Sequence, residues 1–326
     1  MRIALILPYF GKFDSLFPIW LQSCKYNPNI DWIIFTDDKT PYNYPKNVKV
    51  HYTEFETIKK HFQTFYDFNI SLDNPYRLCN FKPAYGEIFS NYIQGYDAWG
   101  FCNNDMIYGN IIKDIPSTDN HKFQIGKFGH LTILPNTEEC CKLYRYADAY
   151  KIAFSTPQPL FFDENTFLKI LSKNGYEVSP LHIAELKVRI KHFHVQNKNN
   201  YKAQCFVWHK GKLERYYCED GKNIKHEEFT YIHFLKRPIT VDENIDITQP
   251  LIIVPNSIFN MPLNKITPEF LLEVNKKGVF LNYWKNSFKP KNLYKRIINR
   301  LYQNKRNCLL IEKMNKLVAE NKYVIQ

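Results

Sequence analysis

Hydrophobic residues near the start of the chain change from strand spacing to helix spacing and back again. Residues 3–7 form a short apolar run, and residues 13–26 place large apolar side chains at the spacing of one helix face. A second apolar run begins at Asp31 and ends in the polar sequence Thr36, Asp37 and Asp38. Strand, helix, strand is the opening of a parallel sheet, so the pattern predicts the α/β class.

The same alternation continues through the first half of the chain. It predicts strands at 48–52, 98–102, 106–108 and 123–134, and helices at 54–68, 84–93, 137–153 and 165–173. After residue 176 the pattern changes to short β segments at 190–195, 205–209, 213–218 and 229–234, followed by a strand at 251–254 and a helix at 268–277. Gly211 and the pair Asp220-Gly221 predict hairpin turns between these segments. We therefore expect an antiparallel meander appended to the parallel sheet.

Composition removes several kinds of site. The chain has 326 residues, of which 44% are hydrophobic, and only 11 glycines, with neither GxGxxG nor GxxxxGK[ST]. The usual glycine-rich phosphate loops are therefore absent. The eight cysteines include no CxxC pair, which favours neither a zinc site nor a disulfide framework and is typical of a reducing cytoplasm. The first apolar run is too short for a signal peptide, and no run approaches the length of a membrane span.

The net charge of +12 favours an anionic partner. Between Lys285 and Arg306 the chain carries basic residues and no acidic ones, interleaved with apolar and aromatic side chains at helical spacing. Such a helix can lie on an anionic membrane surface. Packing on the protein itself, or binding RNA, are the alternatives.

Polar oxygens follow the strand 98–102 directly. Asn103, Asn104 and Asp105 stand at its end, where an α/β sheet carries its chemistry, and Asn103-x-Asp105 could place two oxygen donors on one divalent cation. A polar turn between two strands is the alternative. Asp37 and Asp38 offer the same choice: they could accept hydrogen bonds from a nucleoside, or form an Asp-rich turn.

Charged residues elsewhere could complete such a site. Lys82 precedes a predicted helix, where a lysine can help to hold a phosphate but is often only solvated. Asp163 and Glu164 start the helix 165–173; they could cap it, or one could act as a general base. His233 ends a strand just before Lys236 and Arg237, so it could be a buried core residue or a ligand beside two diphosphate-binding cations.

Several phrases resemble one family. ILPYFGKF, NPNIDWIIFTDD, LCNFKPAYG, GYDAWGFCNNDMIYGNI and EEFTYIHFLKR are similar to segments of small bacterial glycosyltransferases of the GT-A type, encoded in capsule, lipopolysaccharide and other surface-polysaccharide clusters. The resemblance covers roughly residues 1–240. Where this family usually has the first aspartate of a DxD motif, the chain has Asn103.

The resemblance implies a nucleotide-sugar site, a metal and a base. The nucleotide-sugar site would contain Pro8, Thr36, Asp37, Asp38, Lys82, Asn103, Asn104, Lys236 and Arg237. Asp105, Asn103 and His233 would hold Mn²⁺ or Mg²⁺, and Asp163 or Glu164 would be catalytic. Because Asn103 lacks a carboxylate, Asp105 must carry most of the metal affinity, and an inactive sugar-nucleotide-binding relative is an alternative. A basic nucleic-acid-binding protein is a weaker one, since no motif of that class is present.

We therefore expect a glycosyltransferase that moves a sugar, with UDP-hexose as the first donor to test, to a lipid-linked glycan, with inversion. It would act in the cytoplasm at the inner face of the cell membrane, without nucleic acid. The predicted fold is a GT-A-like (Rossmann-like) mixed sheet flanked by helices over residues 1–255, with a nucleotide-binding half at about 1–110 and an acceptor half at about 111–255. Residues 256–326 are predicted to form a basic helical tail.

Overall fold

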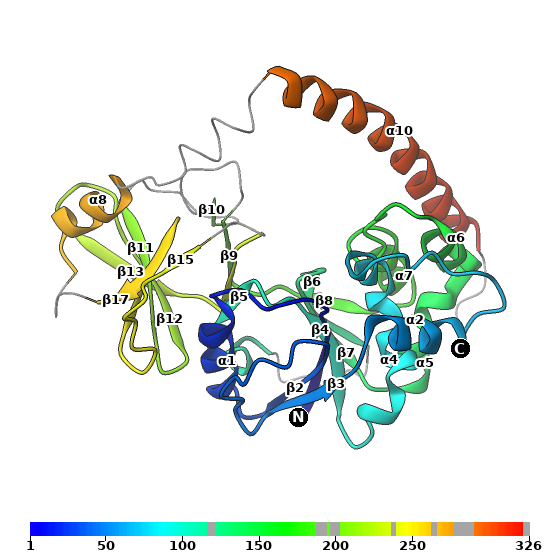
Figure 1. The fold of residues 1–326 in the computed structure, drawn as a ribbon, viewed down its shortest axis with the longest axis horizontal. Helices are drawn as coiled ribbons and strands as arrows, with labels where there is room; N and C mark the ends of the chain where they lie inside the picture. Colours follow the sequence, from blue (N-terminus) through cyan, green and yellow to red (C-terminus); the bar gives the residue numbers. More distant parts are fainter. Residues whose placement is uncertain are drawn as a thin grey trace.

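The structure is a computed structural model of the chain. It describes residues 1–115, 122–186, 194–195, 203–235, 239–261, 266–276 and 290–321. Three β-sheets organise these residues, and helices cover the outer sheets (Figure 1). The protein is therefore of the mixed α/β class, as the sequence predicts.

The largest sheet has seven strands in the order β3-β2-β1-β4-β7-β6-β8. Their bounds are β1 Ile3–Pro8, β2 Ile30–Thr36, β3 Val48–Tyr52, β4 Ala98–Cys102, β6 Phe123–Phe128, β7 Leu131–Pro135 and β8 Glu177–Ser179. The first four strands run parallel, and β7 joins β4 in antiparallel orientation. Phe128 pairs with Leu131, so Gly129 and His130 form a two-residue turn between β6 and β7.

Both faces of the sheet are buried at its central strands β1, β2, β4 and β7, which explains their almost continuous apolar sequences. Ala4 and Ile6 of β1 join one core cluster, while Ile3 and Leu5 join another on the opposite face. The first cluster packs against α2 Phe55–Gln63, α3 Leu78–Phe81, α4 Tyr85–Ile88, α5 Glu138–Lys142, α6 Ala149–Ser155 and α7 Thr166–Lys173. The second packs against α1 Phe17–Lys25.

Two predicted helices are interrupted. Short 3₁₀ turns lie at η1 Pro75–Arg77, η2 Lys82–Ala84, η3 Ser90–Tyr92, η4 Ile112–Asp114 and η5 Leu143–Asp148. The predicted helix 84–93 is only α4 flanked by η2 and η3, because its later half is rich in aromatic and polar residues that favour helices weakly. The predicted helix 137–153 breaks at Ala147 and Asp148, which have φ of +58° and +54°.

A small central sheet has the order β10-β9-β14-β5. Its strands are β5 Met106–Tyr108, β9 Ile183–Glu185, β10 His194–Val195 and β14 Tyr231–His233. The expectation that 229–234 belongs to the meander is wrong, because β14 pairs with β5 and β9 instead. Every residue of β5 and β14 is buried, so the two strands pair inside the core rather than at an exposed sheet edge.

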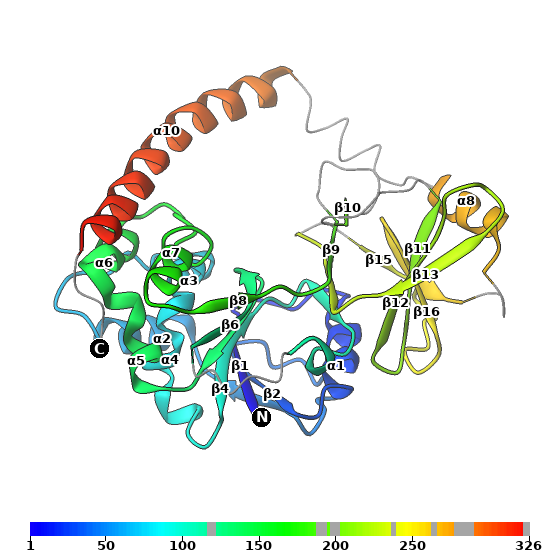
Figure 2. The ribbon, with the colours of Figure 1, turned by 180° about the vertical axis from the view of Figure 1, so that it is seen from behind.

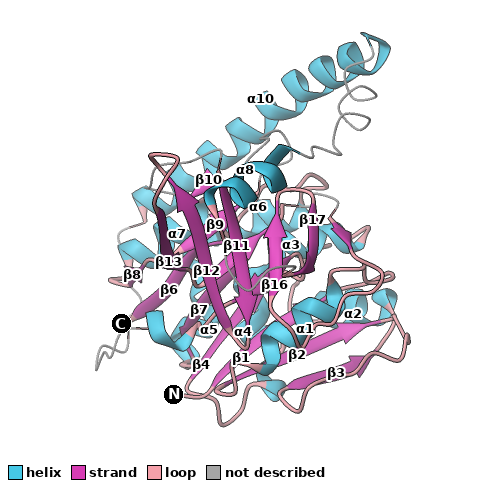
Figure 3. Ribbon diagram, turned by 90° about the vertical axis from the view of Figure 1, so that its left-hand side faces the viewer, coloured by secondary structure: helices cyan, strands magenta, loops and turns pink. Residues whose placement is uncertain are grey.

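The third sheet has six strands in the order β13-β12-β11-β16-β17-β15 (Figure 3). They are β11 Gln204–His209, β12 Lys212–Cys218, β13 Ile224–Glu228, β15 Thr240–Val241, β16 Leu251–Val254 and β17 Ser257–Asn260. The hairpins predicted at Gly211 and Gly221 are confirmed, and both glycines have positive φ. The proposed boundary after residue 255 falls inside the β16–β17 hairpin, so residues up to 260 belong to this sheet. Helix α8, Pro268–Lys276, packs on it through Leu271.

Helix α10, Pro290–Glu320, begins away from the rest of the protein and reaches helices α6 and α7 at its C-terminal end (Figures 1 and 2). That end buries Met314 and Val318 in the first core cluster. Lys173 Nζ donates to the carbonyls of Val318, Ala319 and Asn321 at 2.6 to 2.9 Å, which satisfies the open end of the helix. None of the helices in the described ranges combines the length and apolar character that a membrane span requires.

Candidate functional site

The polar sequence Asn103–Asp105 is the crossover between two sheets. β4 ends in the large sheet and β5 begins in the central one, with only these three residues between them. The crossover is fixed by its backbone: Trp20 Nε1 donates to the Asn103 carbonyl at 3.1 Å, and Asn103 N donates to the His130 carbonyl at 3.0 Å. Its side chains are therefore held in place at the carboxyl end of β4.

Lys82 lies beneath this crossover and is not a solvated surface residue. Its side chain is 12% exposed, and its Nζ donates to Asn103 Oδ1 at 2.8 Å and to the Gly129 carbonyl at 2.5 Å. Nζ is also 4.0 Å from Asp163 Oδ2. Because a cation already occupies the Asn103 oxygen, this arrangement disfavours Asn103 as a metal ligand.

Asp163 and Glu164 reach the same place from the loop before α7. Glu164 Oε1 accepts from Gly129 N at 3.1 Å, and a Cβ on Gly129 would lie 2.1 Å from Asp163 Oδ2. Burial raises the pKa of Asp163 to about 7, although the Lys82 ammonium acts in the opposite direction. Asp163 is buried and Glu164 is exposed, so only one of the two adjacent residues is accessible to solvent.

His233 lies against Asp105, as a shared site requires. In the β5–β14 register His233 is opposite Met106, and its Nε2 is 3.3 Å from Asp105 Oδ1. On its other side, Nδ1 is 4.0 Å from Oε1 of Glu185, which is its register partner in β9. Burial lowers the pKa of His233, but the two carboxylates outweigh it and the net shift is upward.

His130 completes a compact group. Its ring stacks on that of His233 with centroids 4.0 Å apart, and its Nε2 is 3.7 Å from Glu185 Oε1. Its Nδ1 is 3.0 Å from the Tyr231 hydroxyl. Burial, together with the nearby His233 and Lys82 side chains, holds the pKa of His130 well below its usual value. One ligand atom from each of His130, Glu185 and His233 lies within 4.8 Å of the others.

His130 and Glu185 are not among the residues predicted from the sequence. Glu185 is the single acid in the otherwise apolar run 183–186, and an acid inside a buried strand is a usable signal. His130 follows Gly129 inside a predicted strand, where nothing local marks it. Two residues after β1 were also missed: the carboxylate of Asp105 raises the pKa of both Tyr9 and Asp14, although burial is the largest cause in each case.

Asp37 and Asp38 shape the loop that follows β1. Asp37 Oδ1 accepts from Gly11 N at 2.7 Å, and Asp38 Oδ2 accepts from Phe13 N at 2.9 Å. Asp38 Oδ1 accepts from both the amide and the hydroxyl of Thr40. Desolvation opposes ionisation of Asp38, yet these hydrogen bonds lower its pKa overall. The turn interpretation therefore describes both residues in this structure.

Of the other predicted residues, the structure describes some and not others. Pro8 ends β1 and the buried Thr36 ends β2, so both lie at the same sheet edge as Asp37. The side chain of Asn104 is hydrogen-bonded to the Tyr9 hydroxyl, and this hydrogen bond acts to lower the pKa of Tyr9 against the larger effect of burial. Lys236 and Arg237 lie outside the described residues. Of the segment 285–306, the backbone is described from Pro290 onward.

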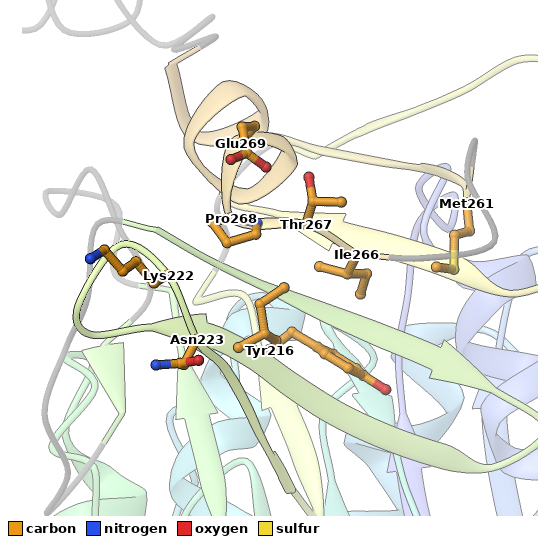
Figure 4. A pocket seen from close by; sticks show the side chains of 9 residues that line it. Tyr216, Lys222, Asn223, Met261, Ile266, Thr267, Pro268 and Glu269 are labelled. Carbon is orange, nitrogen blue, oxygen red and sulfur yellow. The ribbon is translucent and has the colours of Figure 1, made fainter.

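A cavity of about 600 Å³ lies elsewhere, in the six-stranded sheet (Figure 4). It is bounded by α8 and the β12–β13 hairpin, with Tyr216 on its floor. None of the residues predicted for the nucleotide-sugar, metal or catalytic site lines it.

Residues 5–262 match the model of a family described as a family of unknown function (DUF6625). The match spans all three sheets and covers more than half of the chain, so the chain belongs to this family. It leaves α8 and α10 outside the matched region. A search of curated proteins gives no match.

Proposed function

We propose that this family member is a glycosyltransferase that moves a sugar, from UDP-hexose in the first instance, to a lipid-linked glycan of a bacterial surface polysaccharide. One observation carries the proposal: Lys82, Asp105, Asp163 and His233 come from four distant parts of the sequence and converge around the end of β4. These are the residue types that the resemblance assigns to phosphate, metal and base.

The fold supports the same proposal. In the parallel set β3-β2-β1-β4, the ends of β1, β2 and β4 carry Pro8, Thr36 and the Asn103–Asp105 crossover. Ligands of open α/β sheets bind outside the carboxyl ends of such strands. A GT-A-like sheet would place a nucleotide there. Tyr9 lies close to the ends of both β2 and β4, since the carboxylates of Asp38 and Asp105 add to the effect of burial in raising its pKa.

The residues present fit a divalent cation only in part. Asp105 and His233 meet at 3.3 Å, whereas Asn103 is held by Lys82. A bound Mn²⁺ or Mg²⁺ would supply positive charge to the departing diphosphate. Lys82, Lys236 and Arg237 could bind the same phosphates.

Asp163 or Glu164 would take the proton of the acceptor hydroxyl. A pKa of about 7 suits Asp163 to this role, because a base is most effective when its pKa is close to the working pH. Glu164 is the more accessible of the two. A single displacement with one base inverts the anomeric centre, so we expect inversion.

A second candidate function is sugar-nucleotide binding without transfer. It is favoured by the Lys82–Asn103 hydrogen bond. This bond places an ammonium beside the residue that stands where GT-A glycosyltransferases usually have a metal-binding carboxylate. Metal-dependent transfer of a sugar would exclude it.

The acceptor side of the proposal rests on the basic segment Lys285–Arg306. An anionic membrane surface attracts such a segment, which would place the protein at the inner face of the membrane beside its lipid-linked substrate. Deleting residues 285–306 should abolish sedimentation with anionic vesicles. Salt-sensitive retention on RNA, lost in the same deletion, would instead support nucleic-acid binding.

Calorimetric titration of UDP, with and without Mn²⁺, tests the nucleotide site. We expect metal-dependent binding to the wild type, at least about tenfold weaker binding to Asp105→Ala, and unchanged binding to Asp246→Ala, an exposed aspartate in the six-stranded sheet region. Release of UDP from UDP-hexoses in the presence of a lipid-linked acceptor then tests transfer. Absence of UDP binding under both conditions would contradict the proposal.

A further inference from the structure

We infer that His130 Nε2, Glu185 Oε1 and His233 Nδ1 form a buried three-ligand site for a transition-metal dication, on the side of His233 that faces away from Asp105. The three residues come from the β6–β7 turn and from the ends of β9 and β14, which lie between the two larger sheets (Figure 1). The site differs from the predicted Asn103, Asp105 and His233 set, with which it shares only His233.

Each histidine has one nitrogen close to another polar side chain and one nitrogen on the side of the glutamate. His233 Nε2 lies 3.3 Å from Asp105 Oδ1, and His130 Nδ1 lies 3.0 Å from the Tyr231 hydroxyl. Among the described residues, neither His130 Nε2 nor His233 Nδ1 has a hydrogen-bond partner. This is the usual arrangement of metal-binding histidines, in which a second group fixes the ring through the other nitrogen.

Burial makes the two open nitrogens significant. His130 and His233 are each 4% exposed, and Glu185 is 6% exposed. A buried polar atom without a partner costs about 1–3 kcal/mol, so folded proteins rarely keep two side by side. A cation bound by both nitrogens and by the carboxylate would satisfy the two nitrogens together.

The spacing fits one ion. The open nitrogens of His130 and His233 lie 3.7 and 4.0 Å from the same glutamate oxygen. Ligands on a tetrahedral zinc ion, each about 2.1 Å from the metal, are about 3.4 Å apart. Each nitrogen–oxygen separation would therefore have to shorten by less than about 1 Å. The two nitrogens lie within 4.8 Å of each other, so they would approach by up to about 1.4 Å, and the stacked rings would turn toward the ion.

The donor set selects the class of metal. Imidazole nitrogen suits Zn²⁺, Fe²⁺, Ni²⁺ or Cu²⁺, with Co²⁺ between Fe²⁺ and Ni²⁺ in affinity, whereas Mg²⁺ and Mn²⁺ prefer oxygen ligands. Two histidines and one carboxylate leave further coordination positions open, as in catalytic zinc sites. The ion would bind without nucleotide, because the protein supplies all three ligands.

The test is metal binding by the full chain, stripped with a chelator and free of nucleotide. We expect Zn²⁺ to bind in a 1:1 ratio by calorimetry, Co²⁺ to give visible absorption bands of a nitrogen- and oxygen-ligated ion, and Mg²⁺ to compete weakly. Glu185→Gln and His130→Gln should each weaken Zn²⁺ binding by more than about 100-fold, since losing a mere supporting group already costs about 10- to 100-fold. Asp105→Asn should weaken it less.

A matched control is the pair formed by the exposed His226 and the partly buried Glu214, whose Nδ1 and Oε1 are 3.1 Å apart. His226→Gln and Glu214→Gln should leave Zn²⁺ binding unchanged. Circular dichroism of each metal-free variant checks folding. The test needs only one of the two variants His130→Gln and Glu185→Gln to be folded.

Three results would overturn the inference: no 1:1 binding of Zn²⁺ or Co²⁺, wild-type affinity in a folded His130→Gln or Glu185→Gln, or a larger loss in Asp105→Asn than in either. The last would place the ion on the Nε2 side of His233. Sugar transfer is not needed for any of these measurements, so this inference and the proposed function can fail separately.

Discussion

The two sides of the Gly129–His130 turn differ in whether their buried nitrogen groups have hydrogen-bond partners. We call them the lysine side, made of Lys82, Asn103, Gly129, Asp163 and Glu164, and the histidine side, made of Asp105, His130, Glu185 and His233. On the lysine side, the Lys82 ammonium and the Gly129 backbone are hydrogen-bonded to their neighbours, and Asp163 Oδ1 is the buried atom without a partner among the described residues. On the histidine side, two ring nitrogens have no such partner among the described residues.

This difference separates framework from binding surface. Hydrogen bonds made within the protein stabilise the fold and leave little for a ligand. Groups left open at a cost in stability are typical of positions that a ligand completes. We therefore expect changes on the lysine side mainly to destabilise the protein, and changes on the histidine side mainly to alter binding.

The strongest challenge to this comparison is Asp163→Asn. If Asp163 is the base, kcat for sugar transfer should fall by about 100- to 10,000-fold while UDP binding stays unchanged. The wild-type rate should rise with pH up to about 7 and then level off, because only the ionised carboxylate accepts a proton. Measurement of kcat between pH 5 and 9 checks both, with Glu164→Gln as the matched variant. Full turnover in Asp163→Asn would leave Asp163 with a structural role alone.

Gly129→Ala should show how tightly the lysine side is packed. The new methyl group would lie 2.1 Å from Asp163 Oδ2 and 2.9 Å from Glu164 Oε1, so we expect a loss of about 3 kcal/mol in the free energy of unfolding by urea. Gly95→Ala is the control, because its Cβ meets nothing but its φ of +77° costs about 1 kcal/mol. Equal losses in the two variants would mean that Asp163 and Glu164 move aside easily.

Lys82→Met should make stability depend more steeply on pH. Burial already raises the pKa of Asp163 in the folded state, so its contribution to stability is present at low pH and is lost as pH rises through about 7. Without the Lys82 ammonium this pKa should rise further, and the loss should continue to higher pH. We expect a deficit of about 2 kcal/mol against the wild type at pH 8 and a smaller one at pH 5, in urea denaturation. A deficit independent of pH would show that Asp163 does not respond to Lys82.

His130→Leu should have the smallest effect on the metal-free protein. The change removes one open nitrogen and one hydrogen bond to Tyr231, which largely offset each other, so we expect a loss of about 1 kcal/mol or less. Urea denaturation in a chelator measures it, with the exposed His226→Leu as reference. A loss as large as that of Gly129→Ala would make the histidine side part of the framework too.

The sequence predicts the large sheet well because its information is local. The runs at β1 and β2 are apolar on both faces, and the turns at Gly211 and Gly221 need glycine for their positive φ. Each of these patterns can be read within about ten residues. The interrupted helices 84–93 and 137–153 show where local patterns fail as predictors. Ala147 has a positive φ that nothing in the neighbouring sequence indicates.

The site was predictable only in part because its remaining contacts are distant. Asp105 and His233 could be named from their positions at strand ends, and their approach at 3.3 Å agrees with that prediction. The switch of β5 into a separate sheet could not be read from three residues, and it is this switch that brings His233 and Glu185 to the crossover. Lys82 was singled out for phosphate, whereas the structure gives its Nζ three neighbours within the protein.

The pairing of β5 with β14 also sets the order in which the protein can mature. Met106 and His233 are partners in that pairing, and residues 108 to 231 must be synthesised before it can form. Closing so long a loop is slow, and it cannot begin on the ribosome until β14 has emerged. A nascent chain that ends before Tyr231 would hold His130 and Glu185 without His233, and it would have no central sheet to align them.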